Sequence, residues 1–174
     1  QLDFVVNRNF RRSLLCRGDV RPSPEPRLDR LEDMHFASDL CPPRKLDLRK
    51  ARAAPFVRCD GTTVDVVHPL TKAAALCLGR CQPHSLGYGE LYASARREVR
   101  AAGGGALADE AAHLLPELYV LAVRGAVELL RRPRPPAQVV VGRPIAGPLA
   151  RAQLATGRHG LATPQHKSLA LDPF

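Results

Sequence analysis

The order of helical and strand-like segments in the second half of this chain leaves few folds open to it. Three successive segments carry apolar residues at helical spacing, and two strand-like runs then flank the turn-forming sequence PRPPA. The triple glycine at 103–105 and Gly125 are expected to end the second and third helices. Three helices followed by a two-stranded wing is the order of a winged-helix module. We expect the helices at 68–80, 89–105 and 109–125, the third beginning near Asp109 or at Pro116, and the strands at 126–132 and 138–142.

The first third of the chain mixes one helix with short strands. Asp60-Gly61 lies between two strand-like runs in APFVRCDGTTVDVV and predicts a β-hairpin. HFASDL predicts a further strand, and the alternate prolines of RPSPEP predict a loop. Near the other end, a last short helix is expected from about Pro148 to Gly157. We therefore predict an α+β fold with a small helical and β-hairpin N-terminal part, residues 1–62, followed by a winged-helix-like module, residues 63–174.

The opening stretch LDFVVNRNFRRSLL predicts an amphipathic helix with an unusual polar side. Leu2, Val6, Phe10 and Leu14 recur every four residues and form an apolar stripe suited to a core. The opposite side carries asparagine and arginine, which can satisfy backbone carbonyls and carboxylates at a junction. It is a candidate docking face, and the alternative is that it ties down loops of its own domain. The residues of this face are Asn7, Arg8 and Arg11.

Composition restricts the class of protein and of partner. The 174 residues carry a net charge of +9, which favours anionic partners without choosing among nucleic acid, membrane surface and acidic protein. The five cysteines are an odd number without a regular pattern, as expected for reduced thiols in a cytoplasmic protein. We find no apolar run of the roughly 20 residues needed to cross a bilayer, so no membrane partner is expected. We expect the chain to belong to a longer one, because its first residues are already part of a predicted helix.

A search for catalytic or cofactor-binding patterns favours a chain that is not itself an enzyme. The glycines of GYG and GGG lack the strand-then-helix context of a nucleotide loop, so no cofactor site is expected. Cys77, Cys81 and His84 have spacing that zinc could use, but a second pair of ligands is missing, and core packing is the better explanation. Pairs of carboxylates lie at helix starts, where they are explained as partners of the helix dipole. We expect no metal site.

Arginines offer a binding function as an alternative. Arg96, Arg97 and Arg100 lie on one predicted helix, and a candidate basic wing surrounds the predicted hairpin. A winged-helix protein places a helix in the major groove while its wing contacts phosphate. The sequence between Gln82 and Gln138 has no Asn or Gln for reading bases, so a solvated arginine-rich surface stays open as an explanation. The basic wing consists of Arg131, Arg132, Arg134 and Arg143.

The opening helix resembles the start of the methyltransferase regulatory domain family, found in bacterial methyltransferases. That family begins with a pattern of the form LDF-x-x-NR-x-FR-x-[ST]-LL, which residues 2–15 fill. Asp60, Gly61, Pro69 and Lys72 match its DG turn and its KAAL-type helix. The end of the chain resembles the family's C-terminal winged-helix segment through Leu171, Asp172 and Phe174, whereas residues 163–167 depart from its TNLRHE-like stretch.

The resemblance implies a non-catalytic regulatory or substrate-positioning domain. An S-adenosylmethionine-dependent catalytic domain would lie upstream in the same polypeptide and would hold the cofactor, as in rickettsial protein-lysine methyltransferases. The partners implied are that upstream domain, a second copy of the chain, and a methyl acceptor that is a protein, a small molecule or a nucleic acid. The alternative from the residues themselves is a winged-helix nucleic-acid-binding module.

Overall fold

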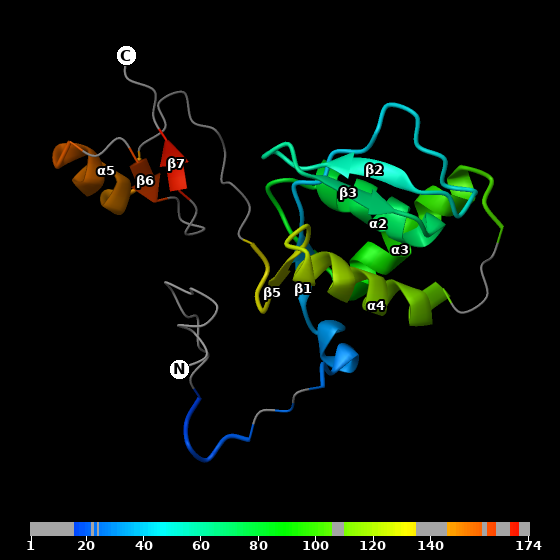
Figure 1. Ribbon diagram of the computed structural model, residues 1–174, viewed down its shortest axis with the longest axis horizontal. Coiled ribbons are helices and arrows are strands. Elements are labelled where there is room, and N and C mark those ends of the chain that lie inside the picture. The colour runs from blue at the N-terminus through cyan, green and yellow to red at the C-terminus, as the bar shows by residue number, and fades with distance from the viewer. Residues whose placement is uncertain are drawn as a thin grey trace, which may run out of the picture. The chain divides into compact units, whose positions relative to one another are not determined.

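The computed structural model describes residues 16–21, 23, 25–105, 110–134, 146–157, 160–162 and 168–170. Two compact units divide the chain, unit 1 from Gln1 to Arg134 and unit 2 from Pro135 to Phe174. Figure 1 shows both, and each is described here by itself. The mixture of helices and small antiparallel sheets gives an α+β fold, as predicted.

Four helical segments of unit 1 are described: the short 3-10 helix η1 (Leu28–Leu31), α2 (Pro69–Arg80), α3 (Tyr88–Ala101) and α4 (Glu110–Val123). Pro69 occupies the first turn of α2, where its missing N–H costs nothing. Gly103 and Gly125 adopt positive φ values of 78° and 72° just beyond α3 and α4. These observations confirm the three predicted helices, although Pro116 lies inside α4 and does not begin it.

The hairpin predicted around Asp60-Gly61 is present. Strands β2 (Ala54–Val57) and β3 (Thr63–Val66) pair antiparallel, with Phe56 opposite Val64. Gly61 has a φ of 82°, a left-handed conformation that glycine adopts without strain. Alternation along both strands buries Phe56, Val64 and Val66 and exposes the residues between them.

A second sheet joins distant parts of unit 1. It has the order β4-β1-β5 and is antiparallel throughout, with His35 of β1 opposite Gly87 of β4 and Leu130 of β5. The predicted wing paired 126–132 with 138–142; here β5 pairs with β1, and residues 138–142 lie outside the described part. The winged-helix module and the division after residue 62 both stay predictions. The strands are β1 (His35–Ala37), β4 (Leu86–Gly87) and β5 (Glu128–Leu130).

The core of unit 1 is built around α2. Ala73 and Ala74 are fully buried, and such small side chains let neighbouring elements approach the helix closely. Gly79 goes further, because a Cβ there would overlap the backbone carbonyl oxygen of Leu40. The buried cluster to which α2 contributes also includes Phe36, Phe56, Leu91, Leu114 and Leu118, which come from β1, β2, α3 and α4.

Unit 2 contains α5 (Pro148–Ala155), β6 (Gly160–Ala162) and β7 (Ser168–Ala170). Strands β6 and β7 pair antiparallel, with Leu161 opposite Leu169. Gly157 follows α5 with a φ of 73°, so the short helix predicted to end there is confirmed. Across the described residues of both units, every helix is too short or too polar to traverse a bilayer.

Candidate functional site

The predicted docking face lies outside the described residues. Asn7, Arg8 and Arg11 all fall within residues 1–15, and Arg143 of the predicted basic wing falls within 135–145. Their roles stay predictions. The structure does place the other three arginines of the wing, and it gives them different roles.

Arg134 holds the fold together. Its backbone N–H donates to the Ser85 hydroxyl at 2.8 Å, and its guanidinium donates to the Pro83 carbonyl oxygen at 3.4 Å. The same guanidinium forms an ion pair with Glu128 of β5. The side chain of Arg134 is therefore committed to fastening the 83–85 loop beside the central sheet.

Arg131 borders a hollow of about 650 Å³ whose charges are mixed. Arg27 and Arg30 supply cations from the η1 region, and Asp29 and Asp33 supply anions. Arg27 pairs with Asp29, and this hydrogen bond is the main reason that the pKa of Asp29 is lowered. With both signs of charge around one opening, this hollow selects neither anions nor cations. Arg132 is exposed.

The predicted arginine cluster of α3 is present on one helix face. Arg96, Arg97 and Arg100 border a hollow of about 690 Å³. The guanidinium carbon of Arg96 lies 5.4 Å from the centre of the Tyr92 ring, and Tyr92 stacks on Tyr88 with ring centres 6.1 Å apart. This stacking fixes Arg96 more firmly than the exposed arginines beside it.

A buried lysine is the most constrained cation that the structure describes. Lys72 is only 1% exposed, and its ammonium donates to three carbonyl oxygens: those of Asp47 at 2.5 Å, Lys50 at 2.7 Å and Arg52 at 3.2 Å. All three carbonyls belong to the loop between Cys41, which forms an isolated antiparallel β-bridge with Val57, and strand β2. Burial lowers the pKa of Lys72, and the Asp47 carboxylate partly opposes that shift. Lys72 thus fixes the path of a loop that has no regular secondary structure of its own.

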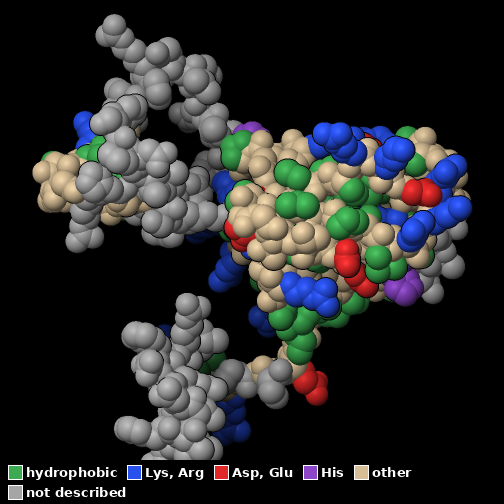
Figure 2. Space-filling model, turned by 45° about the horizontal axis from the view of Figure 1, so that its top comes forward, with side chains coloured by type: hydrophobic (Ala, Val, Ile, Leu, Met, Phe, Trp, Pro, Cys, Tyr) green, Lys and Arg blue, Asp and Glu red, His purple; other side chains and the backbone are tan. Residues whose placement is uncertain are grey.

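The loop fixed by Lys72 is strongly basic. We call residues 44–52 the basic loop; all five of its cationic residues are exposed. Leu48 anchors it in the core, and Asp47 caps a turn by accepting the Arg49 backbone N–H at 2.8 Å. Lys and Arg side chains gather along one margin of unit 1 in Figure 2. The cationic residues of the loop are Arg44, Lys45, Arg49, Lys50 and Arg52.

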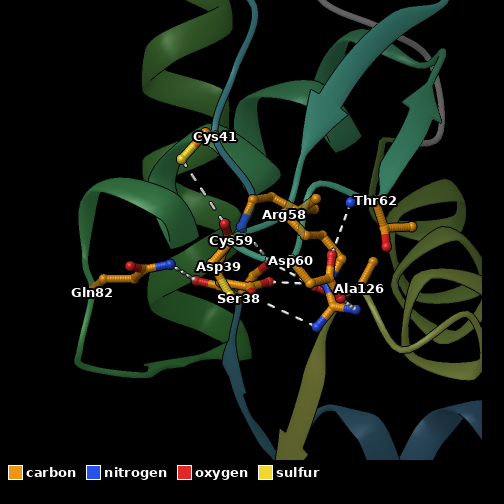
Figure 3. A network of polar contacts seen from close by, with 10 residues as sticks. Ser38, Asp39, Cys41, Arg58, Cys59, Asp60, Thr62, Gln82 and Ala126 are labelled. Carbon is orange, nitrogen blue, oxygen red and sulfur yellow. Dashed lines mark hydrogen bonds and ion pairs between the residues drawn. The ribbon is translucent and has the colours of Figure 1, made fainter. Parts of the chain in front are cut away.

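A second polar junction fastens the β2–β3 hairpin to the segment after β1 (Figure 3). Asp39 accepts hydrogen bonds from the Arg58 guanidinium at 3.1 Å and from the Cys59 thiol at 2.8 Å. Arg58 also pairs with Asp60 at 3.0 Å, and Asp60 accepts the Thr62 backbone N–H at 2.8 Å. The DG turn seen in the sequence is therefore part of an ion-pair network.

The Asp39 junction shifts the pKa values of its members in opposite directions. Burial alone would raise the pKa of Asp39, but hydrogen bonds from Cys59 and Arg58 outweigh it and lower the value. The carboxylate raises the pKa of the Cys59 thiol, chiefly by accepting its hydrogen bond. Cys59 is consequently held in its protonated, unreactive form, unlike a catalytic thiolate.

Ser38 ties the junction to the segment between α4 and β5 and to the 82–85 loop. Its hydroxyl donates to the Ala126 carbonyl oxygen at 2.6 Å, and its own carbonyl accepts the Gln82 side-chain amide at 2.8 Å. These contacts join segments 44 and 88 residues apart in sequence.

Within the described ranges, His, Cys, Asp and Glu residues form no group of three able to hold a metal ion.

Sequence reasoning missed the basic loop, although a signal was present. Lys72 stands in the otherwise apolar helix sequence PLTKAAALCL, where a lysine needs acceptors from elsewhere in the fold. The run RKLDLRKAR supplies five cations against one acid. The sequence does not identify the hydrogen-bond acceptors of Lys72, because they are backbone carbonyl oxygens and every residue has one.

Comparisons with known proteins give a fold likeness. No protein-family model and no curated protein matches the sequence. The structure is similar to PKMT2 from Rickettsia typhi in complex with AdoHcy, with a TM-score of 0.72 and 18% identity. That match covers 98% of this chain and 34% of the PKMT2 chain. A second PKMT2 structure from the same organism gives the same TM-score and identity and is covered over 35% of its length. The chain therefore has the fold of about one third of a methyltransferase.

Proposed function

We propose that this chain is a non-catalytic regulatory or substrate-positioning domain of an S-adenosylmethionine-dependent methyltransferase whose catalytic domain lies upstream. The observation that carries the proposal is the likeness to PKMT2, which extends over nearly the whole chain but only a third of that protein. One of the two PKMT2 structures is a complex with AdoHcy, the product left when S-adenosylmethionine gives up its methyl group. The opening motif of residues 2–15 supports the same assignment.

The polar residues of unit 1 support a scaffolding role. Lys72, Arg134 and Asp39 each join segments that are distant in sequence, and their charges are engaged by carbonyls or ion-pair partners. Cys59 is held protonated by Asp39. Side chains used in this way stabilise a shape, and that shape presents other surfaces to partners. The partners we propose are the upstream catalytic domain, a second copy of the chain and a protein methyl acceptor, with the face containing Asn7, Arg8 and Arg11 as one contact. A cytoplasmic location is part of the same proposal.

Methyl transfer from labelled S-adenosylmethionine to a cell lysate tests the proposed role. The full-length protein is compared with a version that ends just before Gln1. We expect truncation to change the rate of labelling or the set of labelled acceptors. Equal labelling of the same acceptors by both versions would refute a regulatory or positioning role.

Calorimetric titration of AdoHcy into the 174-residue chain tests whether it is non-catalytic. We expect no heat of binding, because the cofactor site is proposed to lie in the upstream domain. Saturable binding by the chain alone would overturn that part of the proposal and would place a cofactor site within these residues.

A nucleic-acid-binding module is the second candidate, and the arginine face of α3 favours it. Arg96, Arg97 and Arg100 border one hollow, and arginine is well suited to phosphate contacts. This candidate predicts tight binding to one duplex sequence and a steep loss of affinity with added salt. Weak binding that is equal for all duplexes would mean that only nonspecific electrostatic attraction is present, and it would contradict this candidate.

A further inference from the structure

The basic loop has a fixed shape that does not depend on its own cationic side chains. Lys72 holds the carbonyls of residues 47, 50 and 52, and Leu48 is buried in the core. Because these anchors use backbone atoms and one apolar side chain, the charges of the loop remain available. A surface whose backbone is already ordered loses less conformational entropy when it binds a partner.

Four of the five cations of this loop make no ion pair with any residue that the structure describes. Arg44, Lys45, Lys50 and Arg52 form no ion pair with a described carboxylate, although Lys50 lies near enough to Asp47 to interact with its charge, whereas Arg49 is paired with Asp47 at 3.3 Å. This ion pair also compensates the negative charge of the Asp47 carboxylate. The hydrogen bond from the backbone N–H of Arg49 is the main cause of the lowered pKa of that carboxylate. The unpaired positive charge therefore dominates the loop.

Two hollows lie along the basic loop. One, of about 330 Å³, is bordered by four cations, Lys45, Lys50, Arg52 and the buried Lys72, and by one acid, Asp47. The other, of about 320 Å³, is bordered by Lys45, Arg49 and Ala102 just beyond α3, and again by Asp47, whose charge is paired with that of Arg49. Lys45 borders both hollows, so a ligand that carries several negative charges along a chain fits this surface better than a single small anion.

The chemistry of the loop favours carboxylates on a polypeptide over a nucleic acid. Residues 44–52 contain no aromatic side chain on which a base could stack and no Asn or Gln that could read a base edge. They also lack the large apolar side chains that insert into a lipid interface, since Leu48 is buried and Leu46 packs against the core. Exposed lysine and arginine around shallow hollows match an acidic protein segment.

We propose that the basic loop is a docking surface for an acidic segment of a partner protein. Lys45, Lys50 and Arg52 receive its carboxylates, and Lys72 holds the receiving surface in shape. This inference goes beyond the proposed function and does not depend on it. Its partner is defined by charge and by the extended form of the segment.

Fluorescence anisotropy with a labelled glutamate-rich peptide tests the docking surface on the 174-residue chain. We expect saturable binding that weakens with added salt. The triple variant K45Q/K50Q/R52Q is expected to bind about tenfold more weakly, because each exposed ion pair contributes modestly. The matched control R17Q/R21Q/R124Q removes the same charge from exposed positions outside the loop and is expected to bind like the unchanged chain.

Three outcomes would overturn the proposal. The first is no binding of the peptide. The second is an equal loss of affinity in the loop and control variants, which would reduce the effect to net charge. The third is tighter binding of a duplex DNA or of phosphatidylserine vesicles than of the peptide, with a larger effect of the loop variant on that ligand. Thermal unfolding of both triple variants shows whether each remains folded, and neither set changes Lys72, Leu48 or the backbone carbonyls that anchor the loop.

Discussion

Replacing Lys72 with methionine tests how the basic loop is held. Methionine keeps an apolar stem of four heavy atoms like that of lysine but removes the ammonium. Three carbonyl oxygens, those of Asp47, Lys50 and Arg52, then lose their shared donor. We expect the basic loop to detach from α2 while the core around the helix persists.

The size of the effect follows from two opposing contributions. A buried acceptor that loses its donor costs about 1–3 kcal/mol, so three acceptors set an upper bound near 9 kcal/mol. Asp47, Lys50 and Arg52 are exposed residues, so water replaces part of what is lost. Removing a desolvated ammonium also relieves a cost, since Lys72 is only 1% exposed. We expect the free energy of unfolding to fall by about 2–4 kcal/mol.

Lys72→Arg separates charge from geometry. Arginine keeps a positive charge, but its planar guanidinium cannot place one nitrogen at the point where three carbonyls converge. We expect a loss of stability for arginine as well, smaller than for methionine. Lys45→Met is the matched control, because Lys45 is exposed and its loss is expected to change stability by less than about 0.5 kcal/mol.

Urea unfolding followed by circular dichroism measures the change in stability, and limited trypsin digestion locates it. The basic loop contains five trypsin cleavage sites. In the unchanged chain, the hydrogen bonds from Lys72 are expected to hold the loop in place and so to protect these sites. We expect early cleavage within residues 44–52 in Lys72→Met. If Lys72→Met unfolds like Lys45→Met and its loop resists trypsin, the three hydrogen bonds do not stabilise the loop and the reasoning is refuted.

The pH dependence of stability gives a second readout of Lys72. Its pKa is lowered from the ordinary value of 10.5, so between the lowered value and 10.5 the unfolded chain binds more protons than the folded one. The contribution of Lys72 to stability therefore rises with pH in that window. We expect Lys72→Met to lack this rise, and an unchanged pH profile would contradict the assignment.

Three further changes test other parts of the fold. Gly79→Ala is expected to destabilise the chain by more than about 2 kcal/mol in urea unfolding, because its Cβ would overlap the Leu40 carbonyl oxygen. Gly89→Ala meets open space near the start of α3 and is expected to stabilise by a few tenths to about 1 kcal/mol; equal effects at both glycines would refute the packing argument. The lowered pKa of Asp39 contributes stability that is present above its ordinary value of 3.8 and lost as pH falls through the lowered value. Asp39→Asn has no such group, so we expect its free energy of unfolding to fall less steeply as pH drops below 3.8. An equally steep fall in the variant and the unchanged chain would contradict this. The same variant removes the carboxylate that raises the pKa of Cys59, so iodoacetamide is expected to label Cys59 faster at mildly alkaline pH; an unchanged rate, read by mass spectrometry of the digested chain, would argue against the thiol–carboxylate hydrogen bond.

The helices and the hairpin were predictable from the sequence because their signals are local. Apolar spacing, Pro69 at a helix start and Gly103 and Gly125 beyond helix ends are read within a few residues. The hairpin follows from Asp60-Gly61 in the same way. In each case the physical cause and the pattern occupy the same short stretch of chain.

The pairing of β5 with β1 was not predicted, since nothing local identifies it. Glu128–Leu130 joins a strand about 90 residues earlier, whereas the partner predicted from the sequence was the nearby strand-like run at 138–142, beyond the turn-forming PRPPA. The contacts of Arg134 were not predicted for a related reason. Its sequence neighbours indicated an exposed wing, whereas its partners Ser85 and Pro83 come from a distant loop.

The way in which Lys72 holds its loop has a consequence for how the sequence of such a chain can evolve. The hydrogen bonds are made to peptide carbonyls, which every amino acid provides, so they place almost no restriction on the identity of residues 47, 50 and 52. Substitutions in the basic loop can alter its charge, or reverse it, without altering its course. Lys72 itself has no such freedom, since its single ammonium serves all three acceptors. A family built on this plan would keep one invariant lysine and vary the loop around it, exploring partners at little risk to the fold.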